Sequence, residues 1–287
     1  MVLKEKIALS LASIMLTFSY PISIQSTKQS TNTKTFSIEA TTKNTSQKSE
    51  EWKSKLEVVL EKEKGVSEYL PYVINSVEKY NFPISKLDAA LVVVSLLSVE
   101  TINYDRYAIS PAGAAGIAQF IPETATGKFG LKTYMPDYLF TARKDLSSAY
   151  SHHKNSEKYL KELEMEKAES EIKEYLRLKK KADNGFLRYK KDLLSKIKDK
   201  NGNYLPDQEL EKIDERFLPE KEIDACVNFL SQLFYLADGN IRVAVSGYNA
   251  GEGRIKKYKG IPPFTETVIY QNKVYSKYRQ LKKIVGN

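Results

Sequence analysis

The chain has 287 residues, of which 41% are apolar, and a formal net charge of +9. This suits one sizeable domain with appendages, or two small domains. The single cysteine, Cys226, excludes an intramolecular disulfide and a cluster of thiolate metal ligands, and its apolar neighbours at helical spacing indicate a core residue. The excess charge gathers in residues 252–287, which hold nine Lys and Arg against two Glu. A basic tract of this kind suits cell wall, membrane surface or nucleic acid, and charge alone does not choose among them.

The N-terminus is typical of an exported protein. A short charged start is followed by residues 7–24, which are apolar apart from serines, a threonine and Pro21. No clear Ala-x-Ala cleavage site follows, so residues 1–24 are predicted to be either a signal peptide or an N-terminal membrane anchor. Residues 25–50 are rich in Ser, Thr, Lys, Asn and Gln and predict a disordered tether. The rest of the chain is then expected to be extracytoplasmic.

From Glu51 onward the apolar spacing is mostly helical, which predicts a mainly α fold. A helix is expected over 69–80, ended by Pro83, and a capping-box-like Ser85-Lys86-Leu87-Asp88 opens a central buried helix over 87–99. Further helices are expected over 223–237, 241–246 and 265–284, the second of them followed by a glycine-flanked turn that holds Tyr248 and Asn249. Any strands should be short and confined to 101–120.

Residues 132–216 are expected to be an insertion that forms a charged helical hairpin. Apolar residues recur at helical spacing from Leu160 to Leu176 among dense Lys and Glu, and again from Phe186 to Ile197. The intervening Asp183-Asn184-Gly185 predicts the turn of the hairpin. Its charged stripes exceed what a core needs, which suggests a protein partner for the insertion or a longer substrate groove.

Glu100 is the best candidate for a catalytic group. It closes an apolar run at a helix C-terminus, where burial and the helix dipole both disfavour an anion, so we expect a raised pKa. A carboxylic acid that stays protonated near neutral pH can protonate the leaving oxygen of a glycosidic bond. Taken alone, the residue also fits an ordinary surface glutamate at the end of a helix.

Other short motifs accompany Glu100. Residues 110–116 read Ser-Pro-Ala-Gly-Ala-Ala-Gly, a loop of small side chains that lets the backbone approach a bulky ligand. Gln119 offers both a donor and an acceptor, and Tyr248 and Asn249 can hydrogen-bond a carboxyl or a substrate. Each motif is weak alone, but their ordered combination is specific.

This combination resembles the signature of lytic transglycosylases, which share their fold with goose-type lysozymes. The resemblance covers about 85–131 and 217–280, including Phe217-Leu218-Pro219-Glu220 and the closing Pro263-Phe264-Thr265-Glu266-Thr267. It implies a lysozyme-like domain over 51–287 with the 132–216 hairpin inserted. Thr101 stands where the family usually has Ser, Ala118 replaces a common Met or aromatic residue, and the step from Glu100 to Ser110 is one residue longer.

The resemblance also implies an activity and its residues. The substrate would be the β-1,4 bond between N-acetylmuramic acid and N-acetylglucosamine in peptidoglycan, with Glu100 acting first as acid and then as base. Attack by the sugar's own 6-hydroxyl would leave 1,6-anhydromuramoyl ends, without a cofactor or a metal. Glycan-binding residues would be Ser110, Gln119, Tyr248, Asn249 and Glu266.

Two alternatives share this fold. A hydrolytic goose-type lysozyme would need a second carboxylate to activate water, and Asp105 is the best candidate, although it stands in a turn-like stretch where Asp is structurally welcome. An inert glycan-binding or scaffold protein is disfavoured by the retention of Glu100. A nucleic-acid-binding role is disfavoured by the export-like N-terminus, so no nucleic acid partner is expected. His152 and His153 lack metal-ligand spacing to other side chains.

Overall fold

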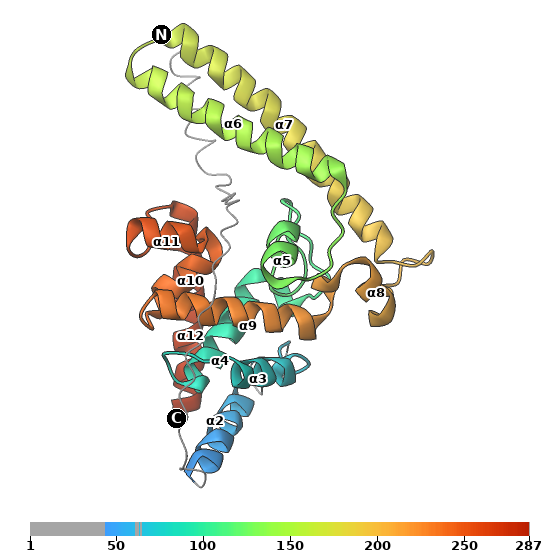
Figure 1. Cartoon of the computed structure of the whole chain (residues 1–287), viewed down its shortest axis with the longest axis vertical. Coiled ribbons are helices and arrows are strands. Elements are labelled where there is room, and N and C mark those ends of the chain that lie inside the picture. The colour runs from blue at the N-terminus through green and yellow to red at the C-terminus, as the bar shows by residue number, and fades with distance from the viewer. Residues whose placement is uncertain (1–43, 61–62, 64, 287) are drawn as a thin grey trace, which may run out of the picture. The chain divides into compact units, whose positions relative to one another are not determined.

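The computed structural model describes residues 44–60, 63 and 65–286, and within them the fold is helical (Figure 1). Extended pairing among these residues is limited to the isolated bridges Ile109–Ala115, Ala115–Phe120 and Lys198–Tyr204. The mainly α prediction is therefore confirmed.

In chain order the helices are α2 (Asn44–Leu60), α3 (Leu70–Lys79), α4 (Lys86–Glu100), η1 (Ile102–Tyr104), α5 (Pro122–Phe129), α6 (Asp137–Lys161), α7 (Met165–Lys196), α8 (Asp207–Ile213), η2 (Glu215–Phe217), α9 (Pro219–Leu236), α10 (Ile241–Ala250), α11 (Glu252–Tyr258) and α12 (Thr265–Gly286).

The chain divides into two compact units. Of the described residues, the first contains 44–60, 63, 77–99 and 228–286. The second contains residues 65–76 and 100–227. Glu100 and the small-residue loop belong to the second unit, whereas α10 and α12 belong to the first.

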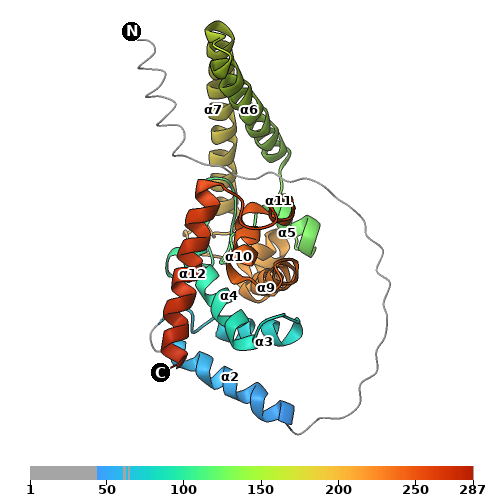
Figure 2. The same ribbon diagram turned by 90° about the vertical axis from the view of Figure 1, so that its left-hand side faces the viewer.

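In the first unit, α4 is the buried central helix that its sequence predicts. The Ser85 hydroxyl accepts from the Asp88 amide at 3.0 Å and donates to the Asp88 carboxylate at 2.6 Å, which closes the N-terminus of the helix. Every residue from 89 to 97 is buried, and the three valines at 92–94 are helical despite their preference for strands. Tyr278 of α12 donates to Asp88 at 2.7 Å, and α10 and α12 lie side by side (Figure 2).

In the second unit, α6 and α7 form a long antiparallel pair (Figure 1). The base of this hairpin is part of the unit's hydrophobic core. Its buried side chains share one cluster with Ile109 and Ala115 beside the small-residue loop and with Phe217 of η2: Leu139, Ala142, Leu146, Ala182, Phe186, Tyr189, Leu193 and Ile197. A helical hairpin is therefore present in this segment, but its two helices are not the predicted ones and its base helps to build the core around the loop.

The predicted turn at Asp183-Asn184-Gly185 is wrong, because α7 runs through it without a break. The chain reverses instead at Glu162–Glu164, where Leu163 has φ = 59° and is 81% exposed. Asp183 supports the helix through an i,i+4 ion pair with Lys179. Gly185 has a packing role, since a Cβ added there would come 2.6 Å from the Cβ of Ala142 on α6.

Other element boundaries also differ from expectation. α2 begins at Asn44, inside the predicted tether, because no Gly or Pro interrupts a helix between 44 and 60. α10 continues to Ala250, so Tyr248 and Asn249 lie in its last turn and not on a separate turn. The Lys198–Tyr204 bridge falls outside 101–120. Cys226 is buried, as predicted.

The predictions for residues 1–24 and for most of 25–50 lie outside the described residues. Within the described part of the chain, none of the helices has the length and apolar character that crossing a membrane requires.

The close contact at Gly185 makes a prediction about stability. Gly185→Ala should destabilise the protein by about 1–3 kcal/mol, because the added methyl meets Ala142 and the two helices must separate. Gly127 in α5 is a matched control, since an added Cβ meets nothing within 4 Å. Gly127→Ala should therefore stabilise by about 0.5–1 kcal/mol through helix propensity alone. Urea denaturation of both variants measures the change in the free energy of unfolding. An equal change in the two variants would contradict the packing role of Gly185.

Candidate active site

Glu100 is the last residue of α4 and its side chain is partly buried. The chain then leaves the helix through Thr101, which is 4% exposed, and through Asn103 and Tyr104, which have φ values of 56° and 57°. Left-handed backbone at two consecutive residues other than glycine is uncommon and is associated with functional sites. The structure thus confirms the predicted place of Glu100 at the end of a buried helix.

Asp105 has a structural role in the next turn. Its carboxylate accepts from the amide of Tyr107 at 2.9 Å, which is the Asx-turn arrangement that favours aspartate at such positions. This agrees with the prediction that Asp is structurally welcome there. Glu123, the other acidic residue near the loop, pairs with Arg143 of α6 at 3.0 Å.

The loop 110–116 is closed by Ser110. Its amide donates to the carbonyl of Ala114 at 2.8 Å, and its hydroxyl accepts from the amide of Ala114 at 2.9 Å. Gly113 and Gly116 have φ values of 82° and 85°, a region that only glycine adopts without strain. Ser110 therefore shapes the loop, whatever further contact it makes with a substrate.

Gln119 follows the loop in a left-handed conformation, with φ = 53°. Its side-chain nitrogen donates to the carbonyls of Ala108 at 3.1 Å and Gly116 at 2.7 Å, so both N–H groups of the amide are used within the loop. We predicted that Gln119 offers a donor and an acceptor to a sugar. The donor part of this prediction is wrong for the structure described, and the side-chain oxygen is the group that can accept from a ligand.

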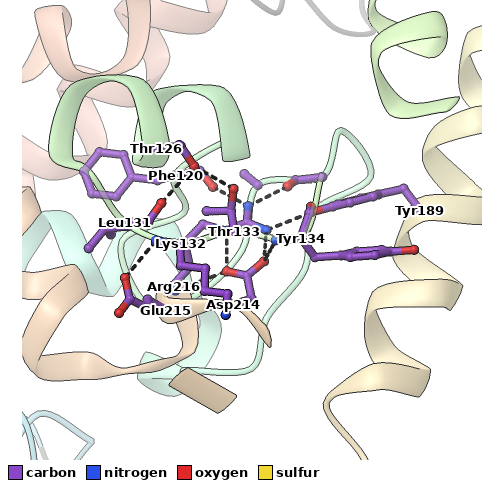
Figure 3. A network of polar contacts seen from close by, with 12 residues as sticks. Phe120, Thr126, Leu131, Lys132, Thr133, Tyr134, Tyr189, Asp214, Glu215 and Arg216 are labelled. Carbon is purple, nitrogen blue, oxygen red and sulfur yellow. Dashed lines mark hydrogen bonds and ion pairs between the residues drawn. The ribbon is translucent and has the colours of Figure 1, made fainter. Parts of the chain in front are cut away.

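Beneath the loop lies Arg216, which is fully buried (Figure 3). Its guanidinium donates to the carbonyls of Gly113, in the middle of the loop, and of Phe120, four residues beyond it, at 3.0 and 2.9 Å. It also donates to both carboxylate oxygens of Asp214, at 2.9 and 2.6 Å, and to the hydroxyl of Tyr189 at 2.7 Å. These contacts use all five N–H donors of an arginine.

The same network includes helix α7 and the irregular segment before α6 (Figure 3). Tyr189 of α7 donates to the carbonyl of Tyr134 at 2.9 Å, and the amide of Tyr134 donates to Asp214 at 3.1 Å. The Tyr189 ring also lies against Gly113, where an added Cβ would come 3.0 Å from it. Arg216, Asp214 and Tyr189 are residues that the sequence analysis missed, because they fall in the segment assigned to the insertion.

Electrostatics keep the buried Arg216 charged. Burial alone would lower the pKa of Arg216, but the adjacent Asp214 carboxylate outweighs this effect and the pKa of Arg216 is raised. Burial also raises the pKa of Tyr189 to about 12, so this hydroxyl stays neutral and can donate to Tyr134. Arg216 therefore remains a full donor to the loop carbonyl of Gly113 and to Asp214.

The first unit contains the other predicted residues. Tyr248 and Asn249 lie in the last turn of α10, which ends at Gly251 with φ = 89°. The Tyr248 ring packs against Phe229 with 5.4 Å between centroids, and the side-chain oxygen Oδ1 of Asn249 accepts from the Thr267 hydroxyl at 2.9 Å.

Glu266 precedes Thr267 in the first turn of α12, where a negative charge is favourable. Its charge also acts on Arg254, whose guanidinium lies 4.9 Å from the Phe264 ring. Burial lowers the pKa of Arg254, and the charge of Glu266 opposes that effect.

The structure thus groups the six predicted residues in two sets. Glu100, Ser110 and Gln119 belong to the second unit, and Tyr248, Asn249 and Glu266 belong to the first unit. That the two sets line one cleft stays a prediction. In the part of the chain that the structure describes, no group of His, Cys, Asp or Glu side chains is arranged to hold a metal ion. His152 instead lies 2.6 Å from Glu171, across the hairpin.

A comparison with protein families bears on the class of this domain. Residues 167–270 match the family model of the transglycosylase SLT domain. This match supports a lytic transglycosylase-type domain in this part of the chain. No solved structure matches the chain.

The limits of the family match differ from those of the resemblance found in the sequence. The match contains Tyr248, Asn249 and Glu266 of the transglycosylase-type domain, and does not extend over Glu100 or the loop at 110–116. It includes residues 167–216, which we expected to lie outside the domain as part of an insertion, and it leaves out 85–131. Arg216 and Asp214 fall inside it.

The Arg216 network makes a second prediction. Arg216→Met should destabilise the protein by about 3–5 kcal/mol, because it leaves the buried Asp214 carboxylate unpaired and two loop carbonyls without their donor. Arg177→Met on α7 is the control, since its pair with Glu174 lies on the surface and should contribute little. Denaturant unfolding of both variants measures the difference, and a small loss for Arg216→Met would contradict the central role of the pair.

Proposed function

We propose that the protein cleaves the β-1,4 bond between N-acetylmuramic acid and N-acetylglucosamine in bacterial peptidoglycan. The match of 167–270 to the SLT domain carries this proposal, because that domain acts on peptidoglycan. Glu100 supports it as the acid, since it ends a helix buried over 89–97 and is itself partly buried. Burial and a helix C-terminus both favour a neutral carboxyl, which is the form that donates a proton.

In the proposed reaction Glu100 acts twice. Its carboxyl first gives a proton to O4 of N-acetylglucosamine as the bond from that oxygen to C1 of N-acetylmuramic acid breaks. The resulting carboxylate then takes the proton from the 6-hydroxyl of the muramic acid as O6 bonds to C1. The proton is returned to Glu100, no water is consumed, and the product ends in a 1,6-anhydro ring.

The remaining residues are proposed to bind the glycan. Gln119 would accept a hydrogen bond through its side-chain oxygen, on a loop that Ser110 shapes. Tyr248, Asn249 and Glu266 would contribute from the first unit, where the contact of Asn249 with Thr267 fixes the orientation of its amide.

The hydrolytic alternative is less well supported. It requires a second carboxylate that activates water, and Asp105, the best candidate, accepts a hydrogen bond from the Tyr107 amide within its own turn. An inert scaffold of the same fold would not need a partly buried glutamate at the end of α4.

The proposed substrate implies an extracytoplasmic location, because peptidoglycan lies outside the cytoplasm. Attachment to the membrane through residues 1–24 stays a prediction. A protein partner for the hairpin also stays a prediction, and the exposed Leu163 at its reversal is the part of the surface to test first.

Glu100→Gln should abolish cleavage of purified peptidoglycan, because an amide keeps the shape of the side chain but cannot donate the proton. We expect a loss of about 10²–10⁴-fold or more in rate, which is the usual contribution of a general acid. Glu220→Gln is the matched control, since Glu220 is an exposed glutamate in α9. Turnover is measured by the release of soluble fragments from cell wall. Fragment release by the Glu100→Gln variant at the wild-type rate would contradict the mechanism.

Product analysis separates the two bond-breaking reactions. Mass spectrometry of fragments released by the wild-type chain should show 1,6-anhydromuramoyl ends, which are lighter by one water than hydrolysed ends. Reducing ends in their place would support the lysozyme alternative. A digest with a known hydrolytic lysozyme provides the reference for the second outcome.

A further inference from the structure

A second glutamate, Glu222, lies directly against the loop that follows Glu100. It is in the first turn of α9 and its side chain is fully buried. A Cβ added at Gly116 would come 2.2 Å from one carboxyl oxygen of Glu222 and 2.1 Å from the carbonyl oxygen of Arg216. Glycine is therefore the only residue type that fits at position 116, between the Glu222 carboxyl and the carbonyl oxygen of Arg216.

The surroundings of this carboxyl do not suit an anion. Among the described residues, neither of its oxygens has a hydrogen-bond partner at normal geometry. Burial raises the pKa of Glu222 well above its ordinary range. The nearby amides of Ala118 and Ile117 and the charge of Arg216 lower the pKa in part, and the charge of Asp214 raises it.

Arg216 and Asp214 are the charged groups that face Glu222, and they are already paired with each other. Their effects on Glu222 therefore oppose one another, and the pair offers it no unshared counter-charge. Among the described residues, the loop side contributes Gly116, Ile117 and Ala118, none of which titrates.

The residues that Glu222 touches are those that hold Gln119. The carbonyl of Gly116 accepts from the Gln119 side chain at 2.7 Å, and Ala118 directly precedes Gln119 in the chain. A displacement of the backbone at 116–118 would thus move the side chain proposed to accept a hydrogen bond from the glycan.

We propose that Glu222 positions the 116–119 turn that presents Gln119 to the glycan, and that loss of its proton releases this turn. The inference rests on the proposed function only for the role of Gln119. A carboxyl whose folded-state pKa is raised stabilises the folded form below its unfolded pKa, and this contribution is lost as pH rises through the folded pKa. The loop is therefore closed at lower pH and opens as the pH rises through the raised pKa of Glu222.

Hydrogen exchange tests this without reference to activity. Wild type and Glu222→Gln are compared at the same pH, and exchange is followed in peptides that cover residues 108–120 and, as an internal control, α6. Protection of the loop in wild type should fall relative to Glu222→Gln by about tenfold for each pH unit between the open-state and closed-state pKa values. Glu220→Gln, two residues earlier on the same helix, should behave as wild type.

If Glu222→Gln does not fold, hydrogen exchange in the wild-type protein alone tests the inference. The inference is supported if residues 108–120 reversibly lose protection as the pH rises. This loss must exceed the pH dependence of the intrinsic exchange rate and must be absent from α6. A loop whose protection follows that of α6 at every pH overturns it. The same protection in wild type and Glu222→Gln across the alkaline range also overturns it.

Glycan binding provides the functional readout. Because Glu100 also titrates, binding of a chitotetraose probe is measured in the Glu100→Gln background, with and without Glu222→Gln. Affinity should fall at alkaline pH in Glu100→Gln and stay level in the double variant. An equal decline of glycan affinity in both variants overturns the role of Glu222. Absence of glycan cleavage by the wild-type protein would overturn the proposed function instead. In that case the hydrogen-exchange result alone decides on the role of Glu222.

Discussion

The buried pair of Arg216 and Asp214 is the interaction on which the second unit depends. Removing two charges from water is costly, and the cost is met here because every N–H of the guanidinium has an acceptor. Two of those acceptors are the carbonyl of Gly113 in the small-residue loop and the carbonyl of Phe120 just beyond it. The loop has few large side chains to pack, so hydrogen bonds hold its backbone: Ser110 closes it, and Arg216 fixes it from below.

This arrangement also explains why the hairpin is not a separate appendage. Tyr189 of α7 accepts from Arg216 and covers Gly113, and buried residues of α6 and α7 share the core with Ile109 and Phe217. The family match includes α7 from residue 167 onward, in agreement with this structural role. The charged, exposed residues that made the segment look like an insertion occupy the outer faces of helices whose inner faces are core.

The sequence predicts elements well where the signal is local. Ser85 and Asp88 identify the start of α4, and the apolar run identifies its burial. Asp183-Asn184-Gly185 misleads because these residues favour a turn in isolation, whereas here Gly185 is required by the approach of Ala142, a residue more than forty positions away. Leu163, at the true reversal, carries no turn signal.

For the site, the sequence predicts the groups that would touch a substrate but not those that support them. Glu100, Ser110 and Gln119 stand in recognisable motifs, while Arg216 and Glu222 lie in charged stretches where burial cannot be read from composition. Glu222 is the clearer case, because an α9 that begins Pro219-Glu220-Lys221-Glu222 reads as a solvated first turn. Only the approach of Gly116 shows that one of its two glutamates faces inward. A loop of small residues needs a side chain such as Glu222 from another helix, because the space that its glycines leave open must be filled.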